Sequence, residues 1–502
     1  MKSLLIYIIF IVTFLTLFAF SYSDRVSGSD QYWYKAEVES SLVSGNPLQI
    51  EYNRIFEVSI ENEELAYLPV HHSLYHVIVF PFAKFFGSLN GVFLSNLIVA
   101  FIGIFFIAKS AFLITKNHLF SAIVAGLVLL FPLVFWQVIQ YLQEIYFFSL
   151  SSIIVFLYLK SFYAEPNSRE EFFSKIAMYA LCCVGIFLYP VFLLTLLCLL
   201  FFDLILDAKK TKYIVLFFFI AGLICHYLSG LLFSGLVGKV LFTNILYGEK
   251  GPSTWGGFML NLTESFDFFY WISFRINKLF LSIIENPFAF IIFAIPVLVI
   301  LLNVFLLLKN PNKKNFKILI MLLSFFLGTL VMLFLSQYNV RYMLYVFPAI
   351  VASLLYVVVQ ISFISKMKKC YVLGAVGLLF VAFVLCNFVF IRGNNARIFK
   401  ERNLEKYYYE NLTHKINAGD KFLFLGKENR ILLSLMPQSI KIFFPHMENK
   451  REDVISRANK FSADKILISE EFSDYAKDLS VGYTPKGVIE LYGTKYLYFE
   501  KP

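Results

Sequence analysis

The sequence predicts a polytopic α-helical membrane protein that ends in a small α/β domain. Three observations favour this fold class. The mean hydropathy is +0.71, and only 16% of the 502 residues are charged, whereas soluble globular domains carry about 25%. Phenylalanine is abundant, with 60 copies. Apolar runs of about 18 residues or more recur along the first four-fifths of the chain, and each can cross a bilayer core of about 30 Å as a helix.

About eleven membrane spans are expected. The first begins after Lys2, reaches Phe20 without a charge and lacks a small-x-small cleavage site, so we interpret it as a retained helix rather than a cleaved signal peptide. The Tyr189-Pro190 step either breaks one long helix or forms a tight turn. The other spans are expected at residues 89–108, 119–136, 145–162, 176–188, 190–206, 213–233, 288–308, 318–336, 343–362 and 371–391.

Lysine and arginine predict the orientation of these spans. If the N-terminus is cytoplasmic, the strongly basic short loops, which include DAKKTK, KNPNKKNFK and SKMKK, all fall on the cytoplasmic side. The formal net charge of +10 is then an orientation signal rather than a footprint of nucleic-acid binding. We expect a multi-pass protein of the inner (plasma) membrane, surrounded by membrane lipids and without a nucleic-acid partner.

The composition changes near residue 392, where charged residues return. Short β-like runs, KFLFLG, KIFFP, DKILIS and TKYLYFEK, alternate there with a helical segment at 450–462. We therefore expect a transmembrane domain over residues 1–391 and a small extracytoplasmic α/β domain over residues 392–502. The second domain contains neither GxGxxG nor a P-loop, which gives a nucleotide-binding role little support.

Few ionisable residues lie within the expected spans, where an ion-coupled carrier would need them. His226 is isolated, and we interpret it as a packed core histidine rather than a proton site. All six cysteines lie in or beside apolar spans, which favours core residues over disulfides or a metal site. The polar chemistry is instead expected outside the membrane, in the loop over residues 23–88.

That loop carries the stretch GSDQYWYKAEVESSLVSGN, residues 28–46, which resembles the first outer loop of GT-C class integral-membrane glycosyltransferases. This class includes the lipid A aminoarabinose transferases and the protein O-mannosyltransferases. Asp30 corresponds to the first acid of their Asp-Glu pair, Tyr34 to a tyrosine, and Ser44-Gly45 to the turn that ends a short helix. Further matches are Leu42, Leu74-Tyr75 and Phe86-Gly87, together with YLQEIYFFSLSSIIVFLYL and NVRYMLYVFPAIVASL.

The departures from this pattern are also informative. Gln31 replaces the second acid of the pair, and His71-His72-Ser73 replaces a Lys-Pro-Pro element. The resemblance therefore implies a GT-C-like fold and sugar transfer of this general type, while it leaves the sugar, a hexose or a pentose, open. The donor would be a polyprenyl-phosphate-linked sugar, and the acceptor a lipid, glycan or protein on the outer face of the membrane.

Such a transfer needs a carboxylate that takes the acceptor's proton and a cation near the departing phosphate. Asp30 is the candidate catalytic base, and its alternative role is a helix N-cap before the short helix expected at 31–44. Glu144, in a short outer turn, is the second catalytic acid, or else a helix-boundary residue. We expect Glu37 and Glu39 to be solvated residues on the helix surface.

Arg341 is the leading candidate for binding the phosphate, because a guanidinium can engage two phosphate oxygens at once. Its alternative role is an interfacial anchor. The segment 74–86 should be an amphipathic helix at the membrane surface. No obligatory cofactor is expected; a divalent metal at the two adjacent histidines is an alternative, although neighbours in sequence cannot easily bind one ion on a regular helix. The remaining candidate substrate-binding residues are Tyr34, His71, His72, Arg275, Lys278 and Tyr342.

Two other functions remain open. A lipid-linked glycan polymerase or ligase would depend on the late outer loop at 234–287 more than on Asp30. A non-enzymatic flippase for lipid-linked sugars would need a polar path through its spans.

Overall fold

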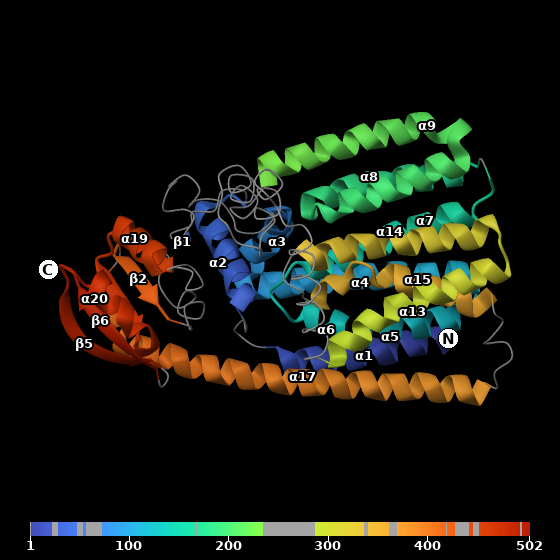
Figure 1. Ribbon diagram of the computed structural model, residues 1–502. Coiled ribbons are helices and arrows are strands. Elements are labelled where there is room, and N and C mark those ends of the chain that lie inside the picture. The colour runs from blue at the N-terminus through green and yellow to red at the C-terminus, as the bar shows by residue number, and fades with distance from the viewer. Residues whose placement is uncertain are drawn as a thin grey trace.

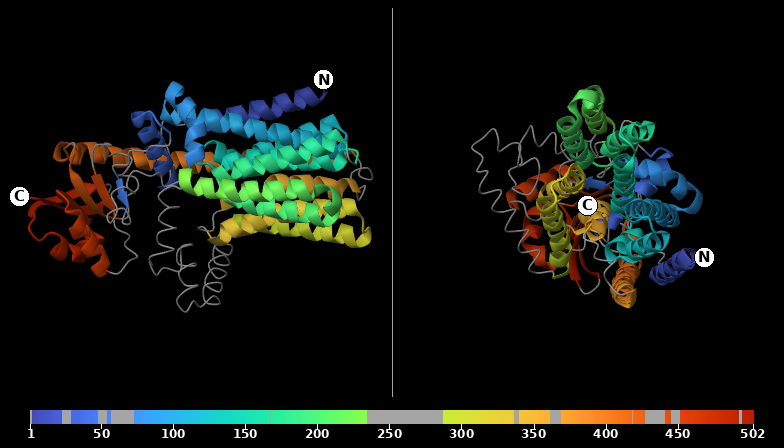
Figure 2. Two further views of the ribbon diagram at one scale, coloured as in Figure 1. Left: turned by 90° about the horizontal axis from the view of Figure 1, so that it is seen from above. Right: turned by 90° about the vertical axis from the view of Figure 1, so that its right-hand side faces the viewer.

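The computed structural model describes residues 2–22, 29–47, 54–56, 73–166, 168–233, 287–335, 340–360, 369–417, 419–426, 441–444, 451–491 and 494–502. Within these residues a bundle of long helices carries a small sheet domain beyond one of its ends (Figure 1). Seen along its length, the bundle is a cluster of roughly parallel helices (Figure 2). The predicted fold class, a helical membrane protein with a small C-terminal α/β domain, is confirmed.

The bundle helices lie on the predicted spans. They are α1 (Lys2–Ser21), α4 (Ser88–Thr115), α5 (His118–Leu130), α6 (Pro132–Val138), α7 (Glu144–Tyr163), α8 (Arg169–Leu188), α9 (Val191–Phe233), α13 (Pro287–Lys309), α14 (Lys313–Leu335), α15 (Phe347–Gln360) and α17 (Lys369–Asn411). Among the described residues, seven helices are long and apolar enough to cross a membrane, or eight if α5 and α6 form one bent span. The expected count of about eleven stays a prediction.

Prolines decide two of the boundaries. The span expected at 119–136 is not straight, because α5 and α6 meet at an angle of 59°. Pro132 opens α6, and a proline is favoured at the first position of a helix because it has no N–H to leave unpaired. At Tyr189-Pro190 the chain turns: a Cβ on Gly185 of α8 would lie 2.5 Å from the ring of Phe192 in α9, so the two helices pack closely.

Helix α9 contains two predicted spans, 190–206 and 213–233. A Cβ on Gly222 would lie only 2.7 Å from the side chain of Leu196. In a straight helix these two residues would be about 39 Å apart, at 1.5 Å per residue. The two apolar halves of α9, Val191–Leu206 and Lys212–Ser229, therefore fold back on each other, as two successive spans do.

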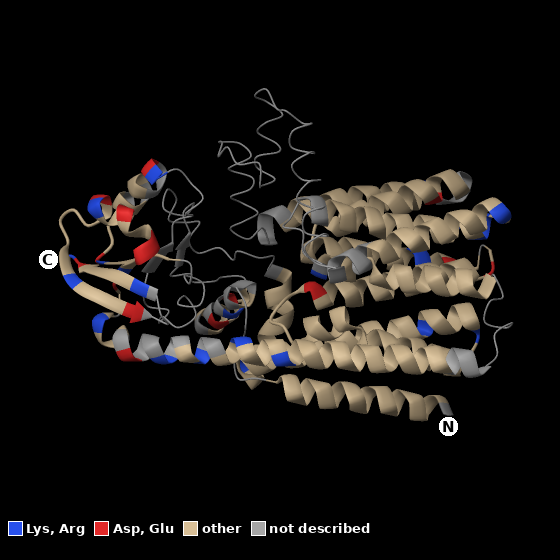
Figure 3. Cartoon of the chain, turned by 60° about the horizontal axis from the view of Figure 1, so that its bottom comes forward, with Lys and Arg blue, Asp and Glu red and all other residues tan. Residues whose placement is uncertain are grey.

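Most charged residues of the bundle lie toward its two ends (Figure 3). The N-terminus lies at one end of the bundle, which we call the far end. The connections that follow α4, α7 and α13 lie at the same end (Figure 1). At the other end, which we call the site end, lie α2 (Ser29–Ser44), α3 (Ser73–Phe86) and the short 3-10 helix η3 (Val340–Leu344). Which end faces the cytoplasm stays a prediction.

Helix α17 joins the bundle to the sheet domain as one element of 43 residues. At 1.5 Å per residue it is about 65 Å long, roughly twice the thickness of a bilayer core. The expected span end at 391 and the expected domain boundary at 392 therefore both fall inside a continuous helix. The charged half of α17 runs beside the site end toward the sheet (Figure 3).

The sheet has the strand order β1-β3-β2-β4-β6-β5. The four strands expected from sequence are present as β2 (Lys421–Leu425), β3 (Lys441–Phe444), β4 (Lys465–Ser469) and β6 (Thr494–Glu500), and the expected helix is α19 (Arg451–Phe461). The other elements of the domain are η4 (Thr413–Lys415), η5 (Glu470–Tyr475), α20 (Ala476–Leu479) and β5 (Thr484–Leu491).

One strand of this sheet comes from the other end of the sequence. Strand β1 (Arg54–Phe56), in the loop between α2 and α3, pairs in parallel with β3 at the edge of the sheet. The C-terminal domain expected from the sequence, residues 392–502, did not include this strand. The loop that follows α2 is thus tied to the C-terminal domain by backbone pairing.

Candidate active site

Helix α2 is held in place by a face of buried residues with helical spacing: Gln31, Tyr34, Val38 and Ser41. It ends at Ser44, and Gly45 follows with a φ of 71°, a conformation that glycine adopts without strain. Both the short helix and the Ser-Gly turn were expected from sequence.

Gln31, which stands where the resembling family has its second acid, anchors α2 to the segment before α7. Its side-chain oxygen accepts a hydrogen bond from the backbone N–H of Tyr141 at 2.9 Å. The Tyr141 hydroxyl in turn donates to the carbonyl oxygen of Ser88, at the start of α4, also at 2.9 Å. These two bonds connect α2, α4 and the chain entering α7.

Two candidate residues predicted separately, Glu144 and Arg341, form an ion pair. Glu144 lies in the first turn of α7, where the helix dipole favours an acid, and Arg341 lies in η3. The Nε atom of Arg341 is 2.8 Å from Oε1 of Glu144, and the side chains are 15% and 1% exposed. The guanidinium carbon also lies 5.5 Å from the ring centre of Tyr342. The site end thus holds a nearly buried carboxylate–guanidinium pair.

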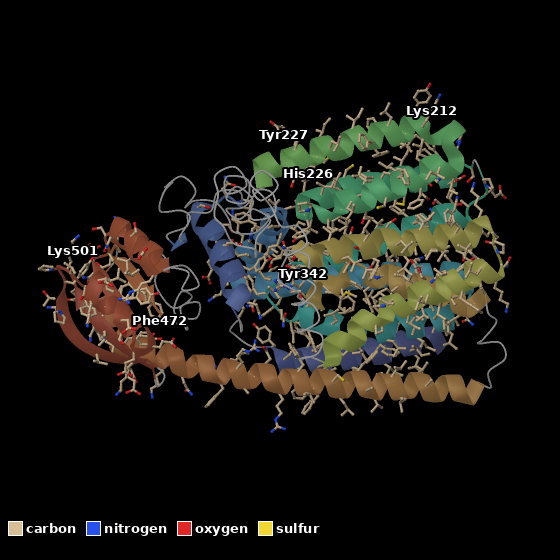
Figure 4. The ribbon with its side chains drawn as sticks, viewed as in Figure 1. Lys212, His226, Tyr227, Tyr342, Phe472 and Lys501 are labelled. Atoms are coloured by element: carbon tan, nitrogen blue, oxygen red, sulfur yellow. The ribbon has the colours of Figure 1, made fainter. Side chains whose placement is uncertain are left out.

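Tyr342 marks the position of this pair in Figure 4, at the end of the bundle that faces the sheet domain. Only 9% of Tyr342 is exposed. His226 lies near the same end, toward the end of α9, while Lys212 lies at the far end. His226 is exposed, so its interpretation as a packed core histidine was wrong. The whole segment Lys212–Ser229 is little covered by the rest of the protein, with only 22% of its residues buried, which explains this exposure.

Tyr34 lies beside the ion pair. Its side chain is 1% exposed, and burial raises the pKa of its hydroxyl well above the usual value; the charge of Glu144 raises it further, while Arg341 acts in the opposite direction. The hydroxyl therefore stays protonated at neutral pH. Tyr34 was predicted to bind substrate; its side chain is covered by protein, and this role stays a prediction.

Glu37 was expected on a solvated surface, and this expectation was wrong. Its side chain is fully buried, and its Oε2 lies 2.9 Å from Nε2 of His76 in α3, which is fully buried as well. Glu39, two residues on, is 34% exposed and pairs with Lys35 at 3.5 Å. It also accepts a hydrogen bond from the hydroxyl of Ser88 at 3.1 Å.

The other candidates are only partly visible. Asp30 lies in the first turn of α2, but its side chain is outside the described part of the structure. His71, His72, Arg275 and Lys278 lie outside the described residues altogether. Among the residues that are described, no group of three or more potential metal ligands comes together. The roles of these five residues stay predictions.

The sequence analysis missed the partner of Glu37. His76 is a single histidine in an apolar helix, and nothing local marks it as charged or functional. A signal was present in the spacing: Tyr75, His76, Val79 and Ala83 are all buried in α3, so the residue lies on the packed face of an amphipathic helix. A histidine on such a face must find a polar partner from another element.

No protein-family model and no curated protein matches the chain. Solved structures do. The structure of ArnT from Cupriavidus metallidurans bound to undecaprenyl phosphate matches 98% of this chain and 97% of its own, at 13% identity and a TM-score of 0.52. The oligosaccharyltransferase of Archaeoglobus fulgidus in the apo form matches 95% of this chain and 71% of its own, at 10% identity and a TM-score of 0.56.

A third structure, of the same archaeal oligosaccharyltransferase, AglB, contains an inhibitory peptide and a dolichol-phosphate. It matches 99% of this chain and 74% of its own, at 11% identity and a TM-score of 0.53. The similarity extends over nearly the whole chain, including the C-terminal domain. The chain has the fold of these GT-C membrane glycosyltransferases, as its outer-loop residues suggested.

Proposed function

We propose that the protein is a membrane glycosyltransferase that moves a sugar from a polyprenyl-phosphate carrier to a lipid, glycan or protein acceptor. The observation that carries this proposal is the fold match over nearly the whole chain to ArnT bound to undecaprenyl phosphate and to AglB in complex with a dolichol-phosphate. The buried pair of Glu144 and Arg341 supports it, because it places a cation at the site end.

The residues are assigned to the reaction as follows. The acceptor hydroxyl oxygen bonds to the anomeric carbon while the bond from that carbon to the phosphate oxygen breaks. The polyprenyl phosphate leaves with the bonding electrons, and Asp30 takes the proton of the acceptor. Arg341 stabilises the negative charge that grows on the departing phosphate. Glu144 orients the guanidinium through its contact with Nε.

This assignment implies an orientation. The site end and the C-terminal domain face the outside of the inner membrane, and the far end faces the cytoplasm. The basic residues at the far end support this, among them Lys116, Lys160, Arg169 and Lys313. The transferred sugar is a hexose or a pentose.

The flippase alternative receives less support. A flippase needs polar groups along its spans. Among the described residues, the fully or nearly fully buried Asp, Glu, His, Lys and Arg side chains of the membrane part are Glu37, His76 and Glu144, all of which lie at the site end. The loop on which a polymerase would depend, at 234–287, lies outside the described residues except for its last one, so experiment must decide.

The function is tested by mass spectrometry of envelope glycans and glycolipids from a deletion strain. Loss of one sugar from a glycan or glycolipid, with accumulation of its lipid-linked donor, is the expected result. The wild-type gene should restore the sugar, and Arg341→Ala should not. Glu170→Gln, an exposed change at the far end, is the matched control and should restore it fully. An unchanged glycan profile in the deletion strain would refute the proposal.

A further inference from the structure

Among the described residues, Glu37 and His76 form the most buried contact between ionisable side chains at the site end. Its Oε2–Nε2 distance is 2.9 Å, and both side chains are 0% exposed. Burying ionisable side chains removes their polar atoms from water, and apolar residues of similar size often serve stability as well or better. Stability alone therefore does not account for this pair. A fixed, directional contact between two helices does.

Tyr34 is close to this contact and is also within the electrostatic influence of the Glu144–Arg341 pair. Tyr34 precedes Glu37 by one turn of α2, and its ring centre is 5.2 Å from that of Tyr75 and 6.3 Å from that of His76. The charges of Glu144, Arg341 and Glu37 all act on the Tyr34 hydroxyl. One side chain, Tyr34, is thus close to both contacts.

Helix α2 has a second anchor at its N-terminal end, the hydrogen bond from Tyr141 to Gln31. Gln31 directly follows Asp30, and Glu37 lies nearly two turns further along. One anchor fixes a point of the helix, whereas two anchors on different elements also fix its rotation about its own axis. A rotation of α2 would move residue 30, and an error of about 1 Å in the placement of a reacting group can cost on the order of 10² in rate.

We propose that Glu37 and His76 are positioning residues: their buried contact fixes the rotation of α2, and with it the placement of Asp30 relative to Arg341. This inference rests on the proposed glycosyltransferase function. Neither residue touches the donor or the acceptor. Their effect is on the rate of transfer and not on the binding of the lipid phosphate.

The test uses the full chain in lipid nanodiscs. Glu37→Gln keeps the size of the side chain and removes its charge. Glu39→Gln, on the partly exposed side of the same helix, is the matched control, because the amide oxygen of glutamine can still accept the hydrogen bond from Ser88. Hydrogen exchange measured by mass spectrometry reports the backbone of α2. Undecaprenyl phosphate serves as the binding probe, and sugar transfer is measured in the complemented deletion strain.

We expect Glu37→Gln to lower the exchange protection of α2 about tenfold, to leave the affinity for undecaprenyl phosphate unchanged and to lower transfer on the order of 10²-fold. Glu39→Gln should change none of these. Wild-type protection of α2 in Glu37→Gln would overturn the proposal, and so would a loss of affinity that matches the loss of transfer, because the pair would then belong to the donor site.

A substitute variant and a second criterion separate failure of this inference from failure of folding or of the proposed function. If Glu37→Gln does not fold, Glu37→Asp replaces it; this variant keeps the charge but shortens the side chain, and the same outcomes are expected of it. If the wild-type chain neither binds undecaprenyl phosphate nor changes envelope glycans, the proposed function fails. The exchange measurement on α2 does not depend on activity, so it still shows whether the pair fixes the helix.

Discussion

The two ends of helix α7 carry opposite charges that suit its dipole equally well. Glu144, in the first turn, is 1% exposed and lies 2.8 Å from Arg341. Lys160, in the last turn, is 40% exposed and lies 3.4 Å from Glu170, which is 56% exposed. The lysine can extend its long stem toward water, whereas the carboxylate cannot. Burial, not sequence position, therefore distinguishes the charge proposed to serve function from the charge that marks a membrane boundary.

The same contrast extends to the partners. At the far end, Lys175 contacts Glu171 at 3.3 Å and Asp203 at 3.4 Å, and these side chains are 12–20% exposed. Arg341 is exposed to a similar degree, at 15%, so the burial contrast lies in the carboxylates, of which Glu144 is only 1% exposed. At the site end, the basic partners are an arginine and a histidine. Arginine holds its charge at any physiological pH and presents a planar fork that suits carboxylate and phosphate alike. This choice of residues is what a phosphate-handling site needs.

The largest expected effect tests the base that the site end is proposed to hold. Asp30 is the second residue of α2 and not its N-cap, which the sequence had offered as an alternative. Asp30→Asn keeps the shape of the side chain but removes the base. Loss of a general base costs on the order of 10²–10⁴ in rate, so transfer in isolated membranes should nearly vanish while expression and thermal stability hold.

Glu39→Gln is the control for this change, because it removes an acid from the same helix. It should leave most of the transfer intact. Full transfer by Asp30→Asn would show that Asp30 is not the base, and the late-loop polymerase would become the better explanation.

The second effect concerns the strength of the ion pair between Glu144 and Arg341. A double-mutant cycle of Glu144→Gln and Arg341→Lys should give a coupling of about 2 kcal/mol, toward the upper part of the range for residues in contact. Transfer should fall in both single variants, since Lys keeps the charge of Arg341 but loses its planar fork. Unfolding of the purified variants gives the coupling, and additive effects would place Arg341 among interfacial anchors.

Much of this fold could be predicted because its signals are local. A run of apolar residues identifies a span wherever it packs, and short β-like runs indicated β2, β3, β4 and β6. Strand β5 was missed because Pro485 and Gly487 interrupt its pattern and most of its residues are exposed. Strand β1 has three residues, and only its pairing with β3, almost 400 residues later, makes it a strand.

The site divides in the same way. Glu144 and Arg341 were predicted one at a time, because each is a charged residue at the end of a span. That they meet is a tertiary fact, and no spacing between positions 144 and 341 encodes it. Glu37 was misread for the related reason that acids on a polar helix are usually solvated. Only the packing of α3 against α2 shows that this acid is buried.

A smaller effect is expected at high pH. Because burial raises the pKa of Tyr34 above its unfolded value of about 10, its contribution to stability is complete below pH 10 and is lost as the pH rises beyond it. Tyr34→Phe removes this ionisation and keeps the ring contacts with Tyr75. The variant should unfold at a higher pH than the wild type in an alkaline titration followed by circular dichroism. An unchanged or lower midpoint would show that the hydroxyl is needed in its neutral form by another group.

The smallest effect is expected at the far end of α7. A cycle of Lys160→Ala and Glu170→Gln should give a coupling below about 0.5 kcal/mol, because water and salt screen a pair whose side chains are 40% and 56% exposed. Sugar transfer should stay at the wild-type level in both single variants. Adding salt should weaken even this small coupling, while the coupling of Glu144 with Arg341 should change little, since a pair buried in protein is screened much less. A coupling as large as that of the buried pair, or a loss of transfer, would show that burial does not separate the two ends of α7, and the assignment of the site to Glu144 and Arg341 would lose its main physical support.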